Sequence, residues 1–169
     1  MSEIPPGTAN NAPGQPLSRA MREVVVRSVV EAQHRNAPLV EAEHLLLALT
    51  RDTESPVHDV LVSAGLDTAG VEAALQAERE LSLRAAGVTP PDPARLVASP
   101  RVARPRWGAS AKDALSRAHR VAAAQRRQRS AHADLLAALL GLDLGTVPRA
   151  LELAGIDRAA LLAGALRAG

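Results

Sequence analysis

The sequence predicts an all-α protein of eight helices, arranged as two pseudo-two-fold four-helix repeats. Apolar residues recur at helical spacing, and no segment alternates with a period of two over a useful length. A gapless shift of 90 residues superposes residues 17–76 on residues 107–166, which indicates an internal duplication. Hydrophobic residues make up 47% of the 169 residues and one residue is aromatic, so we expect a core of Ala, Leu and Val.

The first two helices follow from apolar spacing and from end signals. An apolar face predicts a helix from Leu17, with Ser18 as its N-cap. Pro38 ends this helix, because proline disfavours the α conformation at the preceding residue. The second helix is predicted over residues 41–51, where two acidic residues in the first turn interact favourably with the helix dipole.

The next two helices are marked by their caps. Ser55 and Pro56 introduce the third helix as N-cap and first helical residue, and Gly65 ends it. Asp67 then caps the fourth helix, which continues to about Leu83. These signals complete one four-helix unit.

The second repeat is predicted from the first by the same shift. It superposes the leucine-rich second helices, and it places Gly65 on Gly155 and Asp67 on Asp157. In both copies a helix therefore ends on glycine, and the next one begins on an aspartate two residues later. This shared register supports a duplication that closes into one globule.

The repeats set the domain organisation. Residues 1–16 are rich in Pro and Gly and are predicted to be a disordered tail. The folded domain spans 17–169, with repeat one at 17–83 and repeat two at 107–168. The Pro- and Arg-rich segment 84–106 is predicted to be a linker.

Composition and motifs exclude several classes of protein. The absence of Cys excludes disulfides, thiolate zinc sites and cysteine nucleophiles. One aromatic residue is too few for single-strand nucleic-acid binding by base stacking. No run of 18 apolar residues and no signal peptide is present, so we expect a cytoplasmic protein outside the membrane. No catalytic motif occurs, and we expect neither enzyme activity nor a cofactor.

The histidines give no metal-binding pattern. His44 lacks a second ligand at helical spacing and is predicted to be a buried histidine that connects two helices. The other four are expected to face solvent: His34, His58, His119 and His132.

Charge is distributed unevenly between the two halves. Residues 1–90 hold 7 basic and 12 acidic groups, whereas residues 91–169 hold 13 basic and 6 acidic groups. Four arginines of the second repeat form a candidate partner-binding surface, for an acidic protein or a nucleic-acid backbone: Arg117, Arg120, Arg126 and Arg127. The alternative is a solvated helix face whose cations favour the helix dipole.

Two motifs occur in both repeats. The first helix opens with Leu17-Ser18 in one copy and Trp107-Gly108 in the other. The second helix opens with an eight-residue segment in each copy, Ala42-Glu43-His44-Leu45-Leu46-Leu47-Ala48-Leu49 and His132-Ala133-Asp134-Leu135-Leu136-Ala137-Ala138-Leu139. Over residues 17–166 the chain resembles the amino-terminal domain of Clp chaperones, a double Clp-N repeat whose helices open with aromatic-Thr and Thr-Glu-His-Leu-Leu.

This resemblance implies a Clp N-domain-like fold and a protein-binding function, with a Clp unfoldase, an adaptor or a substrate as partner. The Walker A loop of Clp chaperones needs a Gly-Lys pair, whereas the only lysine here, Lys112, follows an alanine. We therefore expect a free-standing N-domain without the ATPase modules, of the type found in ClpC, or a fragment of a longer protein. A small helical regulator that binds nucleic acid through the second repeat is the alternative.

The resemblance also implies candidate site residues. In ClpC-like domains the Thr after the opening aromatic residue and the Glu of the second motif bind phosphoarginine. Ser18 and Glu43 occupy these positions in repeat one, whereas Gly108 and Ala133 occupy them in repeat two, so one phosphoarginine site is implied. The alternative is that Ser18 is a helix cap and Glu43 interacts with the helix dipole. Trp107 occupies the aromatic position, as a packing residue or as a hydrophobic contact for a partner.

Overall fold

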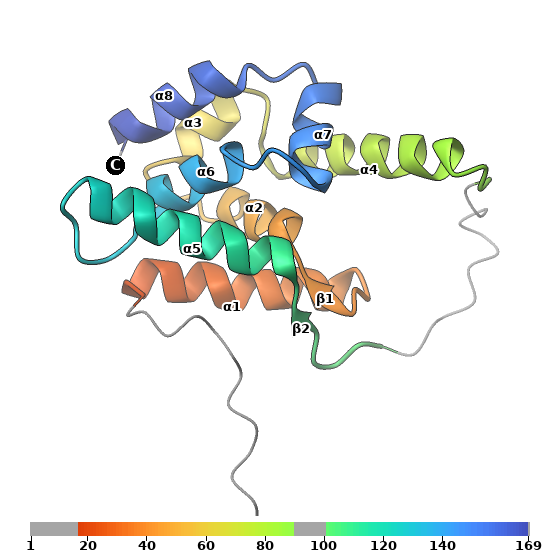
Figure 1. Cartoon of the computed structure of the whole chain (residues 1–169), viewed down its shortest axis with the longest axis horizontal. Helices are drawn as coiled ribbons and strands as arrows, with labels where there is room; N and C mark the ends of the chain where they lie inside the picture. The colour runs from red at the N-terminus through yellow and green to blue at the C-terminus, as the bar shows by residue number, and fades with distance from the viewer. Residues whose placement is uncertain (1–16, 90–100, 169) are drawn as a thin grey trace, which may run out of the picture.

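The computed structural model describes residues 17–89 and 101–168, which form eight helices and one short parallel ladder (Figure 1). The order along the chain is α1 Arg19–His34, β1 Leu39–Val40, α2 Ala42–Thr50, α3 His58–Ser63, α4 Thr68–Ala85, β2 Arg106–Trp107, α5 Ala109–Ala124, α6 His132–Leu140, α7 Thr146–Leu153 and α8 Arg158–Ala168. This architecture confirms the all-α prediction. The predicted tail over residues 1–16 and the middle of the predicted linker lie outside the described residues.

The core is built on α2 and α6, the leucine-rich second helix of each repeat. All nine residues of α6 are buried, and so is every residue of α2 except Glu43. A helix that is apolar on all sides belongs in the interior, because each of its faces needs a partner. Within the described residues, no helix is both long and apolar enough to cross a bilayer.

The outer helices exchange partners between the repeats. In each repeat the first helix packs on the second, as α1 on α2 and α5 on α6. The fourth helix also packs on the third helix of the other repeat, so α4 contacts α7 and α8 contacts α3, although α8 packs mainly on α6 of its own repeat (Figure 1). This reciprocal exchange is the arrangement expected of a pseudo-two-fold duplication.

A two-residue parallel ladder, which the sequence pattern did not predict, also joins the repeats. Leu39 pairs with Arg106, and Val40 pairs with Trp107. Strands of two residues are too short to show an alternating pattern. The ladder holds Trp107 half-buried against the core, which is the packing role considered for this residue.

Polar N-caps begin three helices, and glycines follow the ends of two others, at the expected positions. Ser18 Oγ accepts a hydrogen bond from the Met21 amide at 3.1 Å. Asp67 and Asp157 cap α4 and α8 in the same way, with amide to carboxylate distances of 2.7 and 3.0 Å. Gly65 has a φ of +74° and Gly155 a φ of +67°, a left-handed conformation that favours glycine.

The predicted start of the third helix is wrong by two residues. The helix begins at His58 with Val57 as N-cap, and Ser55 and Pro56 lie in the preceding turn. The Ser55 hydroxyl accepts from the Val57 amide at 3.4 Å, and the Ser55 carbonyl accepts from the His58 amide at 2.9 Å. Serine and proline favour a turn as well as a helix start, so local sequence does not distinguish the two.

Replacing Ser18 with alanine is expected to reduce the free energy of unfolding by about 1 kcal/mol, because the Met21 amide loses its acceptor. Urea denaturation measures this loss. Ser63→Ala is the control, since Ser63 is exposed and makes no side-chain hydrogen bond within the described residues. Equal stability of the two variants would contradict the capping role.

Candidate functional site

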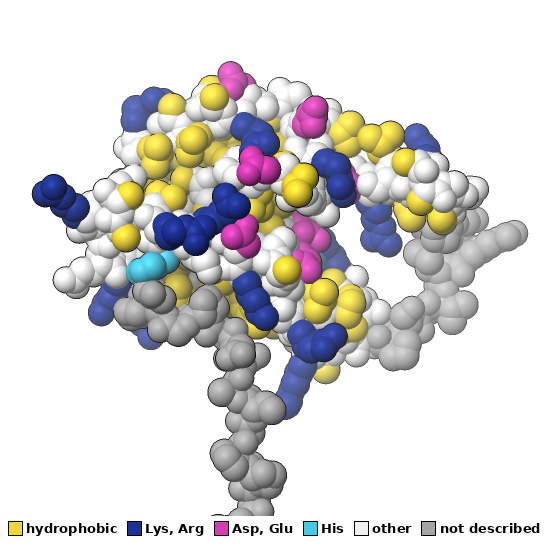
Figure 2. All heavy atoms as spheres, viewed as in Figure 1, with side chains coloured by type: hydrophobic (Ala, Val, Ile, Leu, Met, Phe, Trp, Pro, Cys, Tyr) yellow, Lys and Arg dark blue, Asp and Glu magenta, His cyan; other side chains and the backbone are white. Residues whose placement is uncertain are grey.

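A cleft of about 650 Å³ opens between the end of α1, the start of α2, and the helices α4 and α7. It occupies the hollow between α1 and α4 in the space-filling view (Figure 2). Charged side chains predominate among the residues that line it: Arg35, Glu43, Glu72, Leu75, Gln76, Glu78, Arg79 and Thr146. Both repeats contribute to the cleft, since α7 belongs to the second.

Glu43 differs from the other two glutamates of this cleft in its surroundings. It is the single residue of α2 that is not buried, and it makes no ion pair within the described residues. Burial raises the pKa of Glu43 above the ordinary value of a glutamate, and the charges of Glu41 and Glu78 raise it further, whereas a backbone hydrogen bond and the charge of Arg35 partly oppose this rise. A cation arriving in the cleft would therefore find a partly desolvated, unpaired carboxylate.

The other two glutamates of the cleft are already paired. Glu72 accepts from Arg35 at 3.0 Å, and Arg35 also pairs with buried Glu31 at 2.7 Å. Glu78 accepts from Arg149 of α7 at 2.8 Å, which connects the two repeats. Arg79 lines the cleft without an ion pair within residues 17–89 and 101–168. The cleft thus has one unpaired acid and one unpaired base.

His44 is buried, as predicted, but within the described residues its side chain hydrogen-bonds only the start of its own helix and does not connect two helices. Its Nδ1 accepts from the backbone amide of Glu41 at 2.9 Å, which fixes the first turn of α2. Burial lowers the pKa of His44, and the charge of Arg35 lowers it further. The neutral ring is the form that can accept this hydrogen bond. The first turn of α2, and Glu43 with it, is therefore held in place by a neutral histidine.

The structure does not bring Ser18 and Glu43 together, contrary to the shared site that the resemblance implied. Ser18 caps the start of α1, whereas Glu43 faces the cleft beside Arg35, which caps the end of α1. The 16 residues of α1 separate them, a length of about 24 Å. Two residues that belong to the same repeat in the sequence therefore need not lie close together in the structure.

Glu41, which the sequence analysis did not single out, connects the repeats. Its Oε2 accepts from the Ser110 amide at 3.1 Å and from the Ser110 hydroxyl, at the start of α5. The Ser110 Oγ in turn accepts from the Ala42 amide at 2.8 Å. A Cβ on Gly108 would lie 2.0 Å from Glu41 Oε1, so this carboxylate fits only beside a glycine.

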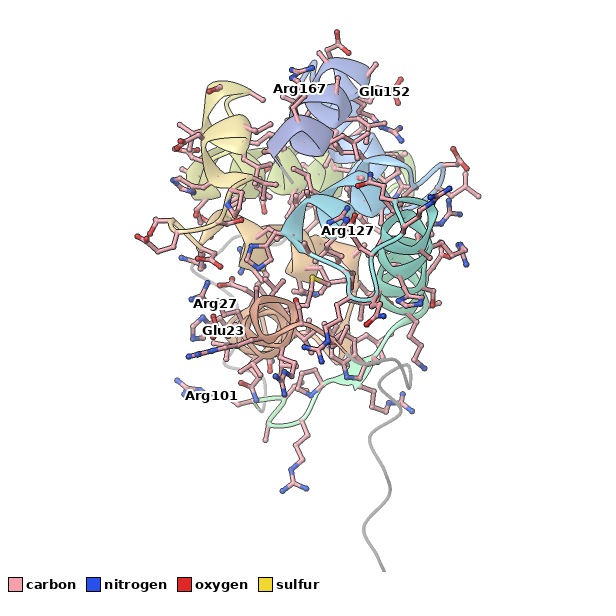
Figure 3. All side chains as sticks on the ribbon, turned by 90° about the vertical axis from the view of Figure 1, so that its left-hand side faces the viewer. Glu23, Arg27, Arg101, Arg127, Glu152 and Arg167 are labelled. Carbon is pink, nitrogen blue, oxygen red and sulfur yellow. The ribbon has the colours of Figure 1, made fainter. Side chains whose placement is uncertain are left out.

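The four arginines of the second repeat do not form one free surface. Arg127 donates to Asp134, whose side chain is fully buried, and lies beside α6 (Figure 3). Arg117 pairs with Asp113 at 2.8 Å. Arg120 and Arg126 are exposed and make no ion pair within the described residues. Two of the four arginines are therefore held in ion pairs within the domain.

The expectation that His132 faces solvent is wrong. Its side chain is 6% exposed, and its Nδ1 lies 2.7 Å from Ser55 Oγ of the first repeat. Its Nε2 lies 3.8 Å from Asp52, which also pairs with Arg27 at 3.5 Å. His132 starts a helix that is buried on all sides, and that position was the signal available in the sequence.

Comparison with known proteins places this geometry in a family. The model of the Clp repeat N-terminal domain matches residues 6–104, which is more than half of the sequence. Among solved structures, the fold is similar to the N-terminal domain of the caseinolytic protease associated chaperone ClpD from Arabidopsis thaliana. The TM-score is 0.60 at 20% identity, covering 89% of this chain and 92% of that one. No curated protein matches. The family match, together with the eight-helix fold, shows that the chain belongs to the Clp repeat N-terminal domain family.

Proposed function

We propose that this chain is a non-catalytic protein-binding module of a Clp chaperone–protease system, and that it receives a cationic side chain of a substrate or adaptor on Glu43. The observation that supports this is the unpaired carboxylate of Glu43 in a cleft of about 650 Å³. Every other residue of α2 is buried, so the fold presents this one acid from its central helix. Membership of the Clp N-terminal domain family supports protein binding in general.

The strength of this contact follows from the chemistry of the pair. A hydrogen bond to a charged group contributes about 1.5–3 kcal/mol. Loss of the Glu43 charge should therefore weaken binding of an arginine-containing peptide by about 10- to 100-fold. A guanidinium fits this role better than an ammonium, because it can donate two parallel hydrogen bonds to one carboxylate.

The test is a titration of a peptide with a single arginine into the protein, followed by calorimetry. Glu43→Gln keeps the shape of the side chain and removes the charge, and it is expected to weaken binding. Glu54→Gln is the matched control, since Glu54 is exposed and lies outside the cleft. Equal affinity of the wild type and Glu43→Gln would refute the proposal.

Phosphoarginine is the modified side chain that the family resemblance suggests, and Arg79 supports it on this chain. Glu43 would receive the guanidinium, and the unpaired Arg79 on the same cleft would receive the phosphate. Because Ser18 lies at the other end of α1, it takes no part in this site. Free phosphoarginine should bind more tightly than free arginine to the wild type, and Arg79→Gln should remove that difference.

The pH dependence of binding has a definite sign. Cation binding needs ionised Glu43, and the pKa of Glu43 is raised by burial, so affinity is expected to fall as pH falls through that raised pKa. Folding behaves oppositely, because the native state holds the proton that the unfolded state releases, and stability from this group rises as pH falls. Glu43→Gln should thus be more stable than the wild type at pH 7, and the difference should vanish in acid. Thermal melting at both pH values measures this.

A further inference from the structure

We infer that the cleft continues into an apolar groove between α4 and α7, and that its occupant is an extended segment of a partner protein carrying an arginine and an aliphatic residue about three residues apart. This inference rests on the proposed function, because the arginine is the residue received by Glu43. It adds a second contact on the partner and a spacing between the two contacts.

The groove has a volume of about 450 Å³ and lies between helices of different repeats. Its lining residues are Glu78, Leu81, Ser82, Ala85, Arg149, Glu152 and Leu153. Leu81 of α4 is 52% exposed and Leu153 of α7 is 47% exposed. Two large leucines exposed on the two sides of one groove indicate a surface that binds an apolar group.

The groove and the cleft are adjacent, since Glu78 lines both. The Glu78 carboxylate is 5% exposed, accepts from Arg149 at 2.8 Å and from Ser82 at 2.6 Å, and is therefore satisfied within the protein. A ligand that crosses this border does not need to supply a charge there. One peptide can thus occupy both hollows without leaving a buried charge unpaired.

The helices set the spacing. Glu72, Leu75 and Arg79 face the cleft, whereas Leu81 and Ala85 face the groove. The centres of these two stretches are about eight residues apart along α4, or about 12 Å at 1.5 Å per residue. An extended chain covers about 3.3–3.6 Å per residue, so about three residues span this distance.

The lining carries charges of both signs, the unpaired Arg79 among them, and the unpaired Glu43 together with the apolar groove favours an occupant with a basic and an aliphatic residue. Glu43 is unpaired at one end of the combined surface, and Glu152 is exposed at the rim of the other end. The apolar floor between α4 and α7 fits a leucine, isoleucine or valine side chain. In the space-filling view, hydrophobic side chains also gather on α4 where it extends beyond the other helices (Figures 1 and 2).

The test uses fluorescently labelled peptides with Arg and Leu three residues apart, titrated into the full chain and followed by anisotropy. Replacing the peptide leucine with alanine should weaken binding by about tenfold, the effect of one buried aliphatic side chain. Leu81→Ser should weaken binding of the peptide that contains leucine by a similar factor, and it should leave the affinity for the alanine peptide unchanged. Val62→Ser is the matched control, because Val62 is 46% exposed on α3, away from the groove.

The outcomes separate this inference from the proposed function. If the Leu and Ala peptides bind equally and both depend on Glu43, the apolar groove is not used and the inference is overturned while the proposed function stands. If no arginine peptide binds the wild type, the proposed function fails first. If sedimentation shows a dimer that Leu81→Ser dissociates, the occupant is a second copy of the chain, and the inference is again overturned. Equal affinity of peptides whose Arg and Leu are one, three and six residues apart would contradict the inferred spacing.

Discussion

Arg127→Ala is expected to lower the free energy of unfolding by about 2–4 kcal/mol. The variant leaves Asp134, whose side chain is fully buried, without its cation. Breaking a fully buried ion pair costs about 3–5 kcal/mol, and we expect less here because Arg127 itself is 29% exposed. Asp134 also accepts from the Ala131 amide at 2.7 Å, so the charge retains one donor. Chemical denaturation measures the difference.

Arg120→Ala is the matched control for this prediction. Arg120 is exposed on α5 and makes no ion pair within the described residues, so its replacement should change stability by less than about 0.5 kcal/mol. The double variant Arg127→Ala with Asp134→Asn should recover part of the lost stability, since the unpaired charge is gone. If Arg127→Ala and Arg120→Ala were equally stable, the second repeat would be a solvated basic surface after all.

Gly108→Ala is expected to cost about 1–3 kcal/mol, although alanine is a small residue and a good helix former. The new Cβ would lie 2.0 Å from Glu41 Oε1 and would displace this carboxylate from the start of α5. The Ser110 amide and hydroxyl would then lose their acceptor at the contact between the repeats. The cost therefore arises from hydrogen bonds made by another residue.

A double-mutant cycle tests this mechanism. Glu41→Ala alone should cost a similar amount, and adding Gly108→Ala to it should cost little more, because the contact is already lost. Full additivity of the two losses would mean that Gly108 matters for its own backbone conformation. Its φ of −78° makes that outcome unexpected, since any residue adopts this value.

The helices, most of their caps and the duplication were predictable because their signals are local or periodic. Asp67 caps α4 through an amide three residues away, and Gly65 ends α3 by its own backbone conformation. The burial of α2 and α6 follows from leucines on all their faces. These features depend on neighbours in sequence, which a pattern can show.

The contacts between the repeats, and the cleft that lies between them, were not predictable in the same way. Glu41 and Ser110 are 69 residues apart, and His132 and Ser55 are 77 residues apart. Each pair forms at the contact between the two repeats, and the spacing of residues within one repeat does not predict which residues make that contact. The same reason explains why Ser18 and Glu43 do not share a site. They share one repeat, yet the exchange of helices places Glu43 in a cleft completed by Thr146 of the other repeat.

The exchange of fourth helices also has a consequence for biosynthesis. When α4 leaves the ribosome, its packing partner α7 has not yet been made, because 60 residues separate Ala85 from Thr146. Translation at about 5–20 residues per second leaves α4 without this partner for roughly 3–12 s. The apolar side chains that α4 presents to α7, among them the lining of the groove, are open to other chains during that interval. The nascent chain therefore exposes an uncovered helix before its second repeat is made.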